Sequence, residues 1–138
     1  MEVNSITNGV VIDHIQAGSS LKLLEYLNID TGFGSVALLM NVPSTKHAKK
    51  DIVKLENVES VDVDVIGLID PGATVIYIRN GEIVDKVKLS LPKKVTNVLK
   101  CKNPRCITSI EAVPHIFNLF DNTGKYACEY CDNLVVPQ

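Results

Sequence analysis

The 138-residue chain carries 14 Lys and Arg residues against 16 Asp and Glu residues, which gives a formal net charge of −2. A composition this close to neutral argues against a nucleic-acid partner, which would require a basic face. No apolar run approaches the roughly 18 to 20 residues that cross a bilayer, and the N-terminus has no signal-like basic and apolar regions, so we expect a cytoplasmic chain with no membrane partner.

The pattern of residues 10–57 predicts three β-strands and one helix. A β-rich run at 10–15 follows an Asn-Gly turn, and residues 20–28 have leucines at helical spacing behind a serine that can cap a helix. A nearly continuous apolar run predicts a strand at 35–42, which Pro43 ends. Another β-rich run predicts a strand at 50–57.

Two patterns compete in residues 59–67, where Val and Asp alternate as in a half-buried strand. Val61, Val65 and Leu68 also fit one face of a helix, and we expect a helix, a choice decided by the family resemblance given below. The Asp-Pro-Gly turn at 70–72 follows. Residues 73–89 then predict a β-hairpin around Asn80-Gly81, the dipeptide favoured in two-residue hairpin turns.

The resulting order is βαββαβ with one extra hairpin strand. This order predicts an α+β, ferredoxin-like domain, in which an antiparallel sheet carries both helices on one face. The other face of the sheet must be covered or must meet ligand, partner or solvent. Pro92 and the Lys93-Lys94 pair interrupt the apolar pattern, so we place the domain at residues 1–93 and a second domain at 94–138.

All four cysteines lie in the second domain, in the motifs CKNPRC (101–106) and CEYC (128–131). Four cysteines permit two disulfides, a redox-active CxxC pair or a metal site. The spacing favours one structural Zn²⁺ with four cysteine ligands. A unit of about 40 residues buries too little apolar surface to fold without such a metal crosslink. We therefore expect a small, zinc-ribbon-like all-β domain, with His115 not required as a ligand.

Motifs of catalysis are missing from the sequence. It contains no GxxxxGK[ST], GxGxxG, GxSxG or HExxH motif, so we expect a protein that is not an enzyme. Two other classes remain for comparison. A nucleic-acid-binding zinc ribbon would need a basic face, and a thiol oxidoreductase using CEYC would not need CKNPRC.

Charged residues interrupt the β-rich runs of the first domain at Asp13, His14, Lys54, Lys86 and Lys88. Each lysine alone is most simply a solvent-facing position on an antiparallel sheet. Asp13 and His14 differ, because consecutive strand residues point to opposite faces unless a bulge intervenes. Lysines, a histidine and a carboxylate would suit an anionic ligand if they converged.

Taken in order, VVIDHI, KLLEYLNI, KDIVKLEN, SLP, NPRC and CEYC closely resemble the regulatory chain family of aspartate carbamoyltransferase. The resemblance covers essentially the whole length. It implies a non-catalytic regulatory subunit in pyrimidine biosynthesis, which pairs as a homodimer through its N-terminal domain. The zinc domain would dock on the catalytic chain and tie catalytic trimers together.

The resemblance also implies site residues. Effector nucleotides of the ATP, CTP and UTP type would bind the N-terminal domain, and the departures Ile76 and Gly81 prevent base selectivity from being carried over. The implied nucleotide residues are Asp13 and Lys54 at the ribose, His14 and Lys86 at the phosphates, Val11 and Ile6 at the base, and Ile83 near the phosphates through its backbone. Apart from the resemblance, Lys50 is a further candidate, because it lies next to the strand at the end of a lysine-rich loop that could extend toward phosphates. The implied metal ligands are Cys101, Cys106, Cys128 and Cys131, and the implied interface residues are Asn103, Arg105 and Glu111.

Overall fold

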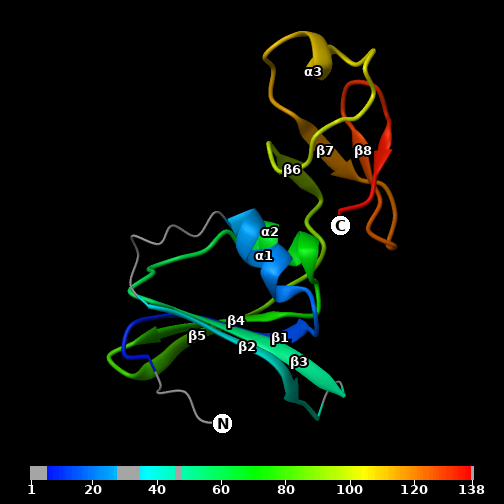
Figure 1. Ribbon diagram of the computed structural model, residues 1–138. Coiled ribbons are helices and arrows are strands. Elements are labelled where there is room, and N and C mark those ends of the chain that lie inside the picture. Colours follow the sequence, from blue (N-terminus) through cyan, green and yellow to red (C-terminus); the bar gives the residue numbers. More distant parts are fainter. Residues whose placement is uncertain (1–5, 28–34, 46–47, 138) are drawn as a thin grey trace. The chain divides into compact units, whose positions relative to one another are not determined.

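The computed structural model describes residues 6–27, 35–45 and 48–137, and the chain divides into two compact units, residues 1–90 and 91–138 (Figure 1). Asn28, the last residue of the first predicted helix, lies outside the described residues. None of the helices in the described part is long and apolar enough to cross a membrane.

The first unit is an antiparallel sheet with two helices on one face (Figure 1). The strand order is β2-β3-β1-β4-β5, the order of a ferredoxin-like sheet with an extra hairpin strand at one edge. The predicted fold class is therefore confirmed. The elements are β1 (Gly9–Gln16), α1 (Ser20–Leu27), β2 (Val36–Pro43), β3 (Lys49–Glu56), α2 (Val63–Ile69), β4 (Thr74–Arg79) and β5 (Glu82–Lys88).

The α2 helix forms although its sequence also alternates like a strand. The side chain of Asp62 caps it by accepting hydrogen bonds from the N–H groups of Asp64 and Val65, at 3.1 and 3.3 Å. Val65 and Leu68 are buried on the face that the helical pattern predicted. Capping and burial together outweigh the weak strand preference of the valines.

The β4–β5 hairpin has the predicted two-residue turn. Asn80 and Gly81 both have positive φ, at 53° and 76°, as a type I′ turn requires. The turn is also tied to the segment before β1, because the N–H of Gly81 donates to the carbonyl of Thr7 at 2.8 Å. The turn thus pairs Arg79 with Glu82, and the register shifts once farther along the hairpin, between Tyr77 and Ile78.

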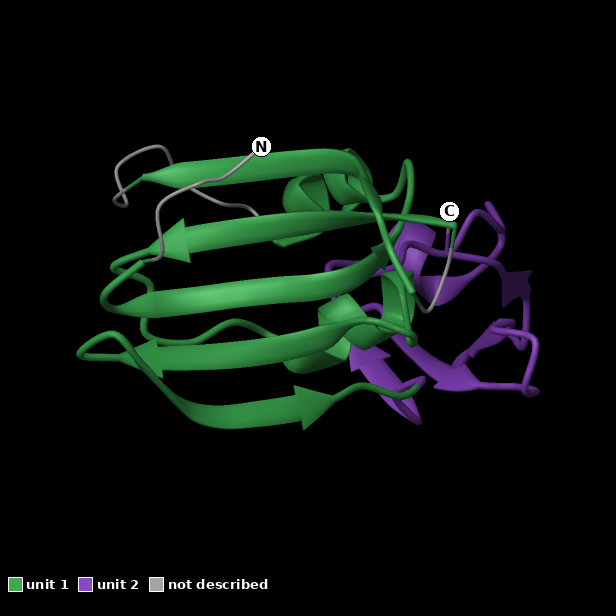
Figure 2. Ribbon diagram, turned by 90° about the horizontal axis from the view of Figure 1, so that it is seen from below, with its two compact units in different colours: residues 1–90 green, residues 91–138 purple. Residues whose placement is uncertain are grey.

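The core lies between the sheet and its helices, and no helix of the described residues covers the opposite face of the sheet (Figure 2). Alternate residues of β1 and β3 point into this core, which leaves Val11, Asp13 and Lys54 on the open face. The fully buried core side chains are Val10, Ile12, Ile15, Leu23, Val53, Leu55, Ile66 and Val75.

A buried carboxylate ties β3 to α1 and β2. Asp51 is 0% exposed and accepts hydrogen bonds from the Ser20 hydroxyl at 2.6 Å and from the N–H groups of Asn41 at 3.0 Å and Gly18 at 3.1 Å. Burial alone raises the pKa of Asp51, but these three donors outweigh it and hold the pKa below its usual range. The carboxylate is thus the common anchor of three elements.

The second unit is a four-stranded sheet of order β6-β7-β8-β9 with one short helical turn. Phe117 and Tyr126 are its fully buried aromatic side chains, and the Tyr126 hydroxyl donates to the Pro92 carbonyl at 2.7 Å. Two such rings are a small core for a unit of this size. Its elements are β6 (Lys94–Thr96), α3 (Ile107–Ile110), β7 (Ile116–Leu119), β8 (Tyr126–Cys128) and β9 (Leu134–Val135).

We predict that Asp51→Asn lowers the free energy of unfolding of the first unit by about 2 to 3 kcal/mol at pH 7, because buried donors lose a charged acceptor. The lowered pKa means that Asp51 stabilises the fold above about pH 4 and that this stabilisation is lost as the pH falls through the folded-state pKa. Urea unfolding at pH 7 and pH 3 measures both effects. Glu82→Gln, at an exposed position of β5, should change little, and an equal loss in both variants would contradict the prediction.

Candidate metal centre and ligand-binding face

The four cysteine sulfurs converge in the second unit. All four sulfurs lie within 4.8 Å of one another, and the pairs Cys101–Cys131 and Cys106–Cys128 are 3.6 and 3.7 Å apart. A disulfide would need about 2.05 Å. A tetrahedron of sulfurs 2.3 Å from Zn²⁺ has edges of about 3.8 Å, so the spacing fits a four-thiolate zinc site.

The environments of the sulfurs differ. The Thr108 hydroxyl donates to Cys106 Sγ at 3.2 Å, and this bond with the Thr108 N–H lowers the pKa of Cys106 to about 7. Burial raises the pKa of Cys101 to about 12. The thiols would therefore not ionise together by themselves, and a divalent cation supplies the charge that makes all four thiolates. His115 stays outside the cluster, where its Nδ1 accepts from the Cys101 N–H at 3.4 Å.

The predicted interface residues surround the first cysteine turn. The Asn103 side chain accepts from the Arg105 N–H at 3.1 Å, and its carbonyl accepts from the Cys106 N–H at 3.1 Å, so Asn103 shapes the turn. Arg105 and Glu111 are exposed. Sequence reasoning missed the apolar side chains beside them: Ile107 and Ile110 of α3 are 37% and 70% exposed.

In the first unit, cross-strand pairing places several predicted residues in one row on the open face. Lys54 of β3 lies opposite Val11 of β1, Val11 lies opposite Ile76 of β4, and Ile76 lies opposite Lys86 of β5. Directly opposed residues point to the same face of a sheet. The row therefore has a lysine at each end and aliphatic side chains, each 9% exposed, between them.

A bulge at one end of this face explains the Asp13-His14 pair. The β1–β3 register shifts between Ile12 and Ile15, and His14 has φ 57°, in the left-handed region. The bulge brings His14 Nδ1 to 3.9 Å from Asp13 Oδ2, so the side chains do not diverge as in a regular strand. Among the described residues, no group hydrogen-bonds to His14 Nδ1, although this atom is buried.

Two further lysines lie near Asp13. Lys50 Nζ is 2.9 Å from Asp13 Oδ1. Burial raises the pKa of Asp13, but the bond from Lys50 and the His14 N–H outweigh it, so the pKa is lowered overall. Lys88, which sequence reasoning did not include in the site, lies opposite Thr74, which in turn lies opposite Asp13. Its spacing of two residues from Lys86 is the signal that could have placed both on one face.

The other end of the open face is apolar. Gly9 lies opposite Ile78, and Ile78 lies opposite Ile83, whose side chain is 61% exposed. Ile6 lies beside Gly9, since a Cβ added to that glycine would come within 3.0 Å of Ile6 Cδ1. Along β1 the face thus passes from apolar side chains to a carboxylate, an imidazole and lysines.

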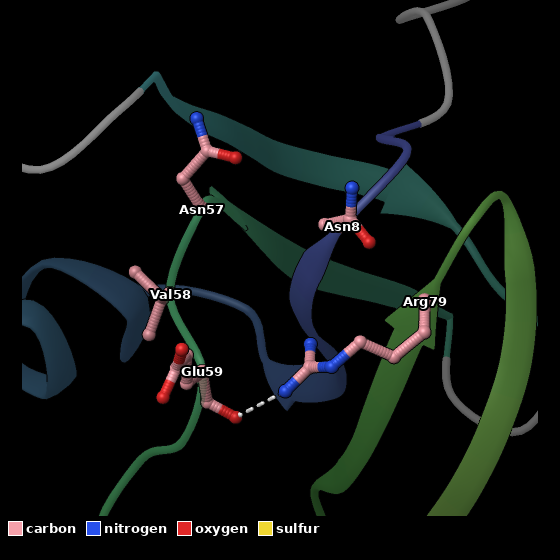
Figure 3. A pocket seen from close by; sticks show the side chains of 5 residues that line it. All are labelled: Asn8, Asn57, Val58, Glu59 and Arg79. Carbon is pink, nitrogen blue, oxygen red and sulfur yellow. Dashed lines mark hydrogen bonds between the residues drawn. The ribbon is translucent and has the colours of Figure 1, made fainter.

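A separate hollow of about 390 Å³ lies where β1 begins and β3 and β4 end (Figure 3). Its lining residues are Asn8, Asn57, Val58, Glu59 and Arg79. The Arg79 guanidinium donates to the carbonyls of Glu59 and Ile78, at 3.0 and 3.1 Å, so it stabilises the chain locally. None of the predicted site residues lines this hollow.

A closed set of four thiolates leaves no coordination position for a reacting group, so the metal centre has a structural role. A non-catalytic metal domain in one chain with a sheet domain that has a cationic open face fits a regulatory or binding protein. Family models agree: residues 1–90 match "Aspartate carbamoyltransferase regulatory chain, allosteric domain", and residues 93–136 match the "metal binding domain" of the same chain.

Similar proteins give the same result over nearly the full length. The aspartate carbamoyltransferase regulatory chain of Clostridium botulinum (strain Hall) is 52% identical over 97% of this chain and 93% of its own length. Those of Clostridium acetobutylicum and Bifidobacterium longum are 47% and 45% identical, covering 97% and 96% of this chain and 93% and 96% of the relatives. The chain belongs to the aspartate carbamoyltransferase regulatory chain family.

Several predictions from the sequence are thereby confirmed. The chain is regulatory and not catalytic, its partner is the catalytic chain of aspartate carbamoyltransferase, and its four cysteines form the site of one structural zinc ion. A nucleic-acid-binding zinc ribbon is not favoured.

We predict that Cys128→Ser lowers bound zinc from one ion per chain to none and unfolds residues 91–138, because metal binding supplies the folding free energy of a unit with so small a core. Zinc analysis together with limited proteolysis measures this, and residues 1–90 should remain protected. Ala127→Ser, a matched control on the same strand, should keep the metal. A protected second unit without zinc would contradict the prediction.

Proposed function

We propose that residues 1–93 form a nucleotide-binding allosteric domain and that residues 94–138 form a zinc domain that docks on the catalytic chain. ATP, CTP and UTP are the proposed effectors, bound on the open face of the five-stranded sheet (Figure 2). The observation that carries this proposal is the row in which Lys54, Val11, Ile76 and Lys86 lie opposite one another.

The dimensions of the row suit a nucleotide. Lys54 and Lys86 are three strand spacings apart, which is about 14 Å between their Cα atoms. At this distance the two ammonium groups approach an extended ligand from opposite sides. This supports separate roles, with Lys54 at the ribose and Lys86 at the phosphates.

The bulge supplies the remaining polar contacts. The Asp13 carboxylate, kept ionised by its lowered pKa, can accept hydrogen bonds from ribose hydroxyls. His14, with its unused Nδ1, and Lys88 extend the site toward phosphate. Lys50 is bound to Asp13 and so helps to orient the carboxylate.

Ile6 and Val11 offer apolar contacts to the base. The resemblance assigns the backbone of Ile83 to the phosphates, but Ile83 lies at the apolar end of the face, three residues before Lys86 on β5. Ile76, in the centre of the row, has no hydrogen-bonding group, so base discrimination must use backbone groups. Gly81 adds no side chain beside the base.

We predict that Lys86→Ala raises the Kd of the zinc-loaded chain for ATP and CTP about tenfold, because a charge-assisted contact to phosphate is lost. Isothermal titration calorimetry measures the affinities. Lys22→Ala, on α1 and therefore on the helix side of the sheet, is the control and should bind as the unchanged chain does. Equal affinities for both variants would refute the proposed pocket, while the family assignment would stand.

The proposed docking surface consists of Asn103, Arg105, Glu111, Ile107 and Ile110. Its two isoleucines are exposed apolar groups ringed by polar ones, the usual composition of a protein interface. Because the cysteines must remain reduced to bind zinc, the reducing cytoplasm is the proposed compartment.

We also propose a homodimer formed through the first unit, at the edge strand β2. Among the described residues, nothing pairs with the outer edge of either edge strand, β2 or β5. The β5 strand carries four charged residues (Glu82, Asp85, Lys86 and Lys88), which discourage pairing. β2 carries none in Val36–Pro43, and Val36 and Met40 are each 43% exposed. An uncharged, apolar edge favours pairing with a second copy.

We predict that Val36→Lys converts the isolated chain from dimer to monomer, because the charge must be desolvated when the edge is paired. Sedimentation equilibrium measures the mass, for which one chain accounts for 15.1 kDa. The control is Val84→Lys on the opposite edge, a position 58% exposed, which should leave the dimer intact. If Val84→Lys dissociated the dimer and Val36→Lys did not, the dimer would form through β5, which would contradict the proposed interface at β2.

A further inference from the structure

The hydrogen bond from Thr108 singles out one of the four metal ligands. Thr108 is the second residue of α3, which begins directly after Cys106, and its hydroxyl lies 3.2 Å from Cys106 Sγ. Both residues are buried, at 8% and 2% exposure. Within the described part of the chain, Cys106 is the one ligand that accepts a hydrogen bond from a side chain outside the cysteine cluster.

The contact is specific to the hydroxyl. A buried hydroxyl requires a hydrogen-bond partner. Among the described residues, the acceptor for the Thr108 hydroxyl is the Cys106 sulfur. The Thr108 N–H also interacts with this sulfur, so the hydroxyl and the backbone of one residue act on the same ligand. A methyl group in place of the hydroxyl would fill the same space without meeting the sulfur.

Four thiolates and one Zn²⁺ leave a charge of about −2 in a largely buried site, which is costly unless donors disperse it. We propose that Thr108 is a positioning residue of the zinc site: its hydroxyl holds Cys106 Sγ toward the metal, withdraws charge from the sulfur and slows loss of the ion. The proposal depends on the four-cysteine site described above. It also makes α3, which carries Ile107 and Ile110, part of the same hydrogen-bonded unit as the metal.

The test compares Thr108→Val, which keeps the shape and removes the hydroxyl, with Thr108→Ser, which keeps the hydroxyl. In the full chain, we expect Thr108→Val to speed zinc transfer to a chromogenic chelator about tenfold, as is typical when an outer hydrogen bond to a ligand is lost. With Co²⁺ in place of zinc, its sulfur-to-cobalt charge-transfer band should move to lower energy, because the sulfur becomes more electron-rich. Thr108→Ser should match the unchanged chain in both measurements.

The band position separates this role from a purely structural one, which would lower stability without moving the spectrum. Thr96→Val, at an exposed position of β6, is the control for loss of a hydroxyl. An unmoved band in Thr108→Val, or zinc loss equally fast in Thr108→Ser, would overturn the proposal. Should Thr108→Val fail to bind cobalt, Thr108→Ala removes the same hydroxyl and is judged by the same band. One zinc per chain in the unchanged protein confirms the metal site independently of either result.

Discussion

Convergence of four cysteine sulfurs within 4.8 Å is the constraint on which the second half of the molecule depends. The unit of residues 91–138 has two fully buried aromatic rings and sheets of two- to four-residue strands, so apolar burial alone cannot offset the entropy of ordering it. The metal fixes both cysteine turns at once. The first of these turns leads into α3, whose exposed isoleucines belong to the proposed docking surface.

The first unit is stabilised by an apolar core. This core lies on one side of the sheet, and the other face is the one on which we propose that ligands bind. Regular strands would point Asp13 and His14 to opposite sides. One bulge brings them together, and one register aligns Lys54 with Lys86 across four strands. The regular strands thus align the two lysines, while the closeness of Asp13 and His14 depends on the bulge in β1.

Much of this architecture could be predicted from the sequence, because the signals are local. The Asn80-Gly81 turn, the cysteine spacing and the order of elements each depend on neighbours a few residues away. At α2 two local patterns competed and the family resemblance decided for the helix, and the cap at Asp62 became known only from the structure. The family resemblance added the site residues, and the structure brings Val11, Lys54 and Lys86 into one row.

Other features depend on pairing between distant segments and could not be predicted. Asp51 in the sequence is an ordinary strand carboxylate, and only the fold brings Ser20 to it. The bulge at His14 depends on the register with β3. The spacing of Lys86 and Lys88 predicts a shared face, but only the register with β4 places Lys88 in line with Asp13. The hydroxyl of Thr108 lies two residues from a ligand, but its direction is set by the turn that α3 makes.

Sedimentation of catalytic trimers mixed with this chain, in zinc-loaded and zinc-stripped form, tests most directly whether the metal builds the docking surface. The zinc-loaded chain should shift the trimers to a dodecamer-sized complex, and the stripped chain should leave them at their own mass until zinc is restored. A complex of equal mass without zinc, or none with it, would contradict this account.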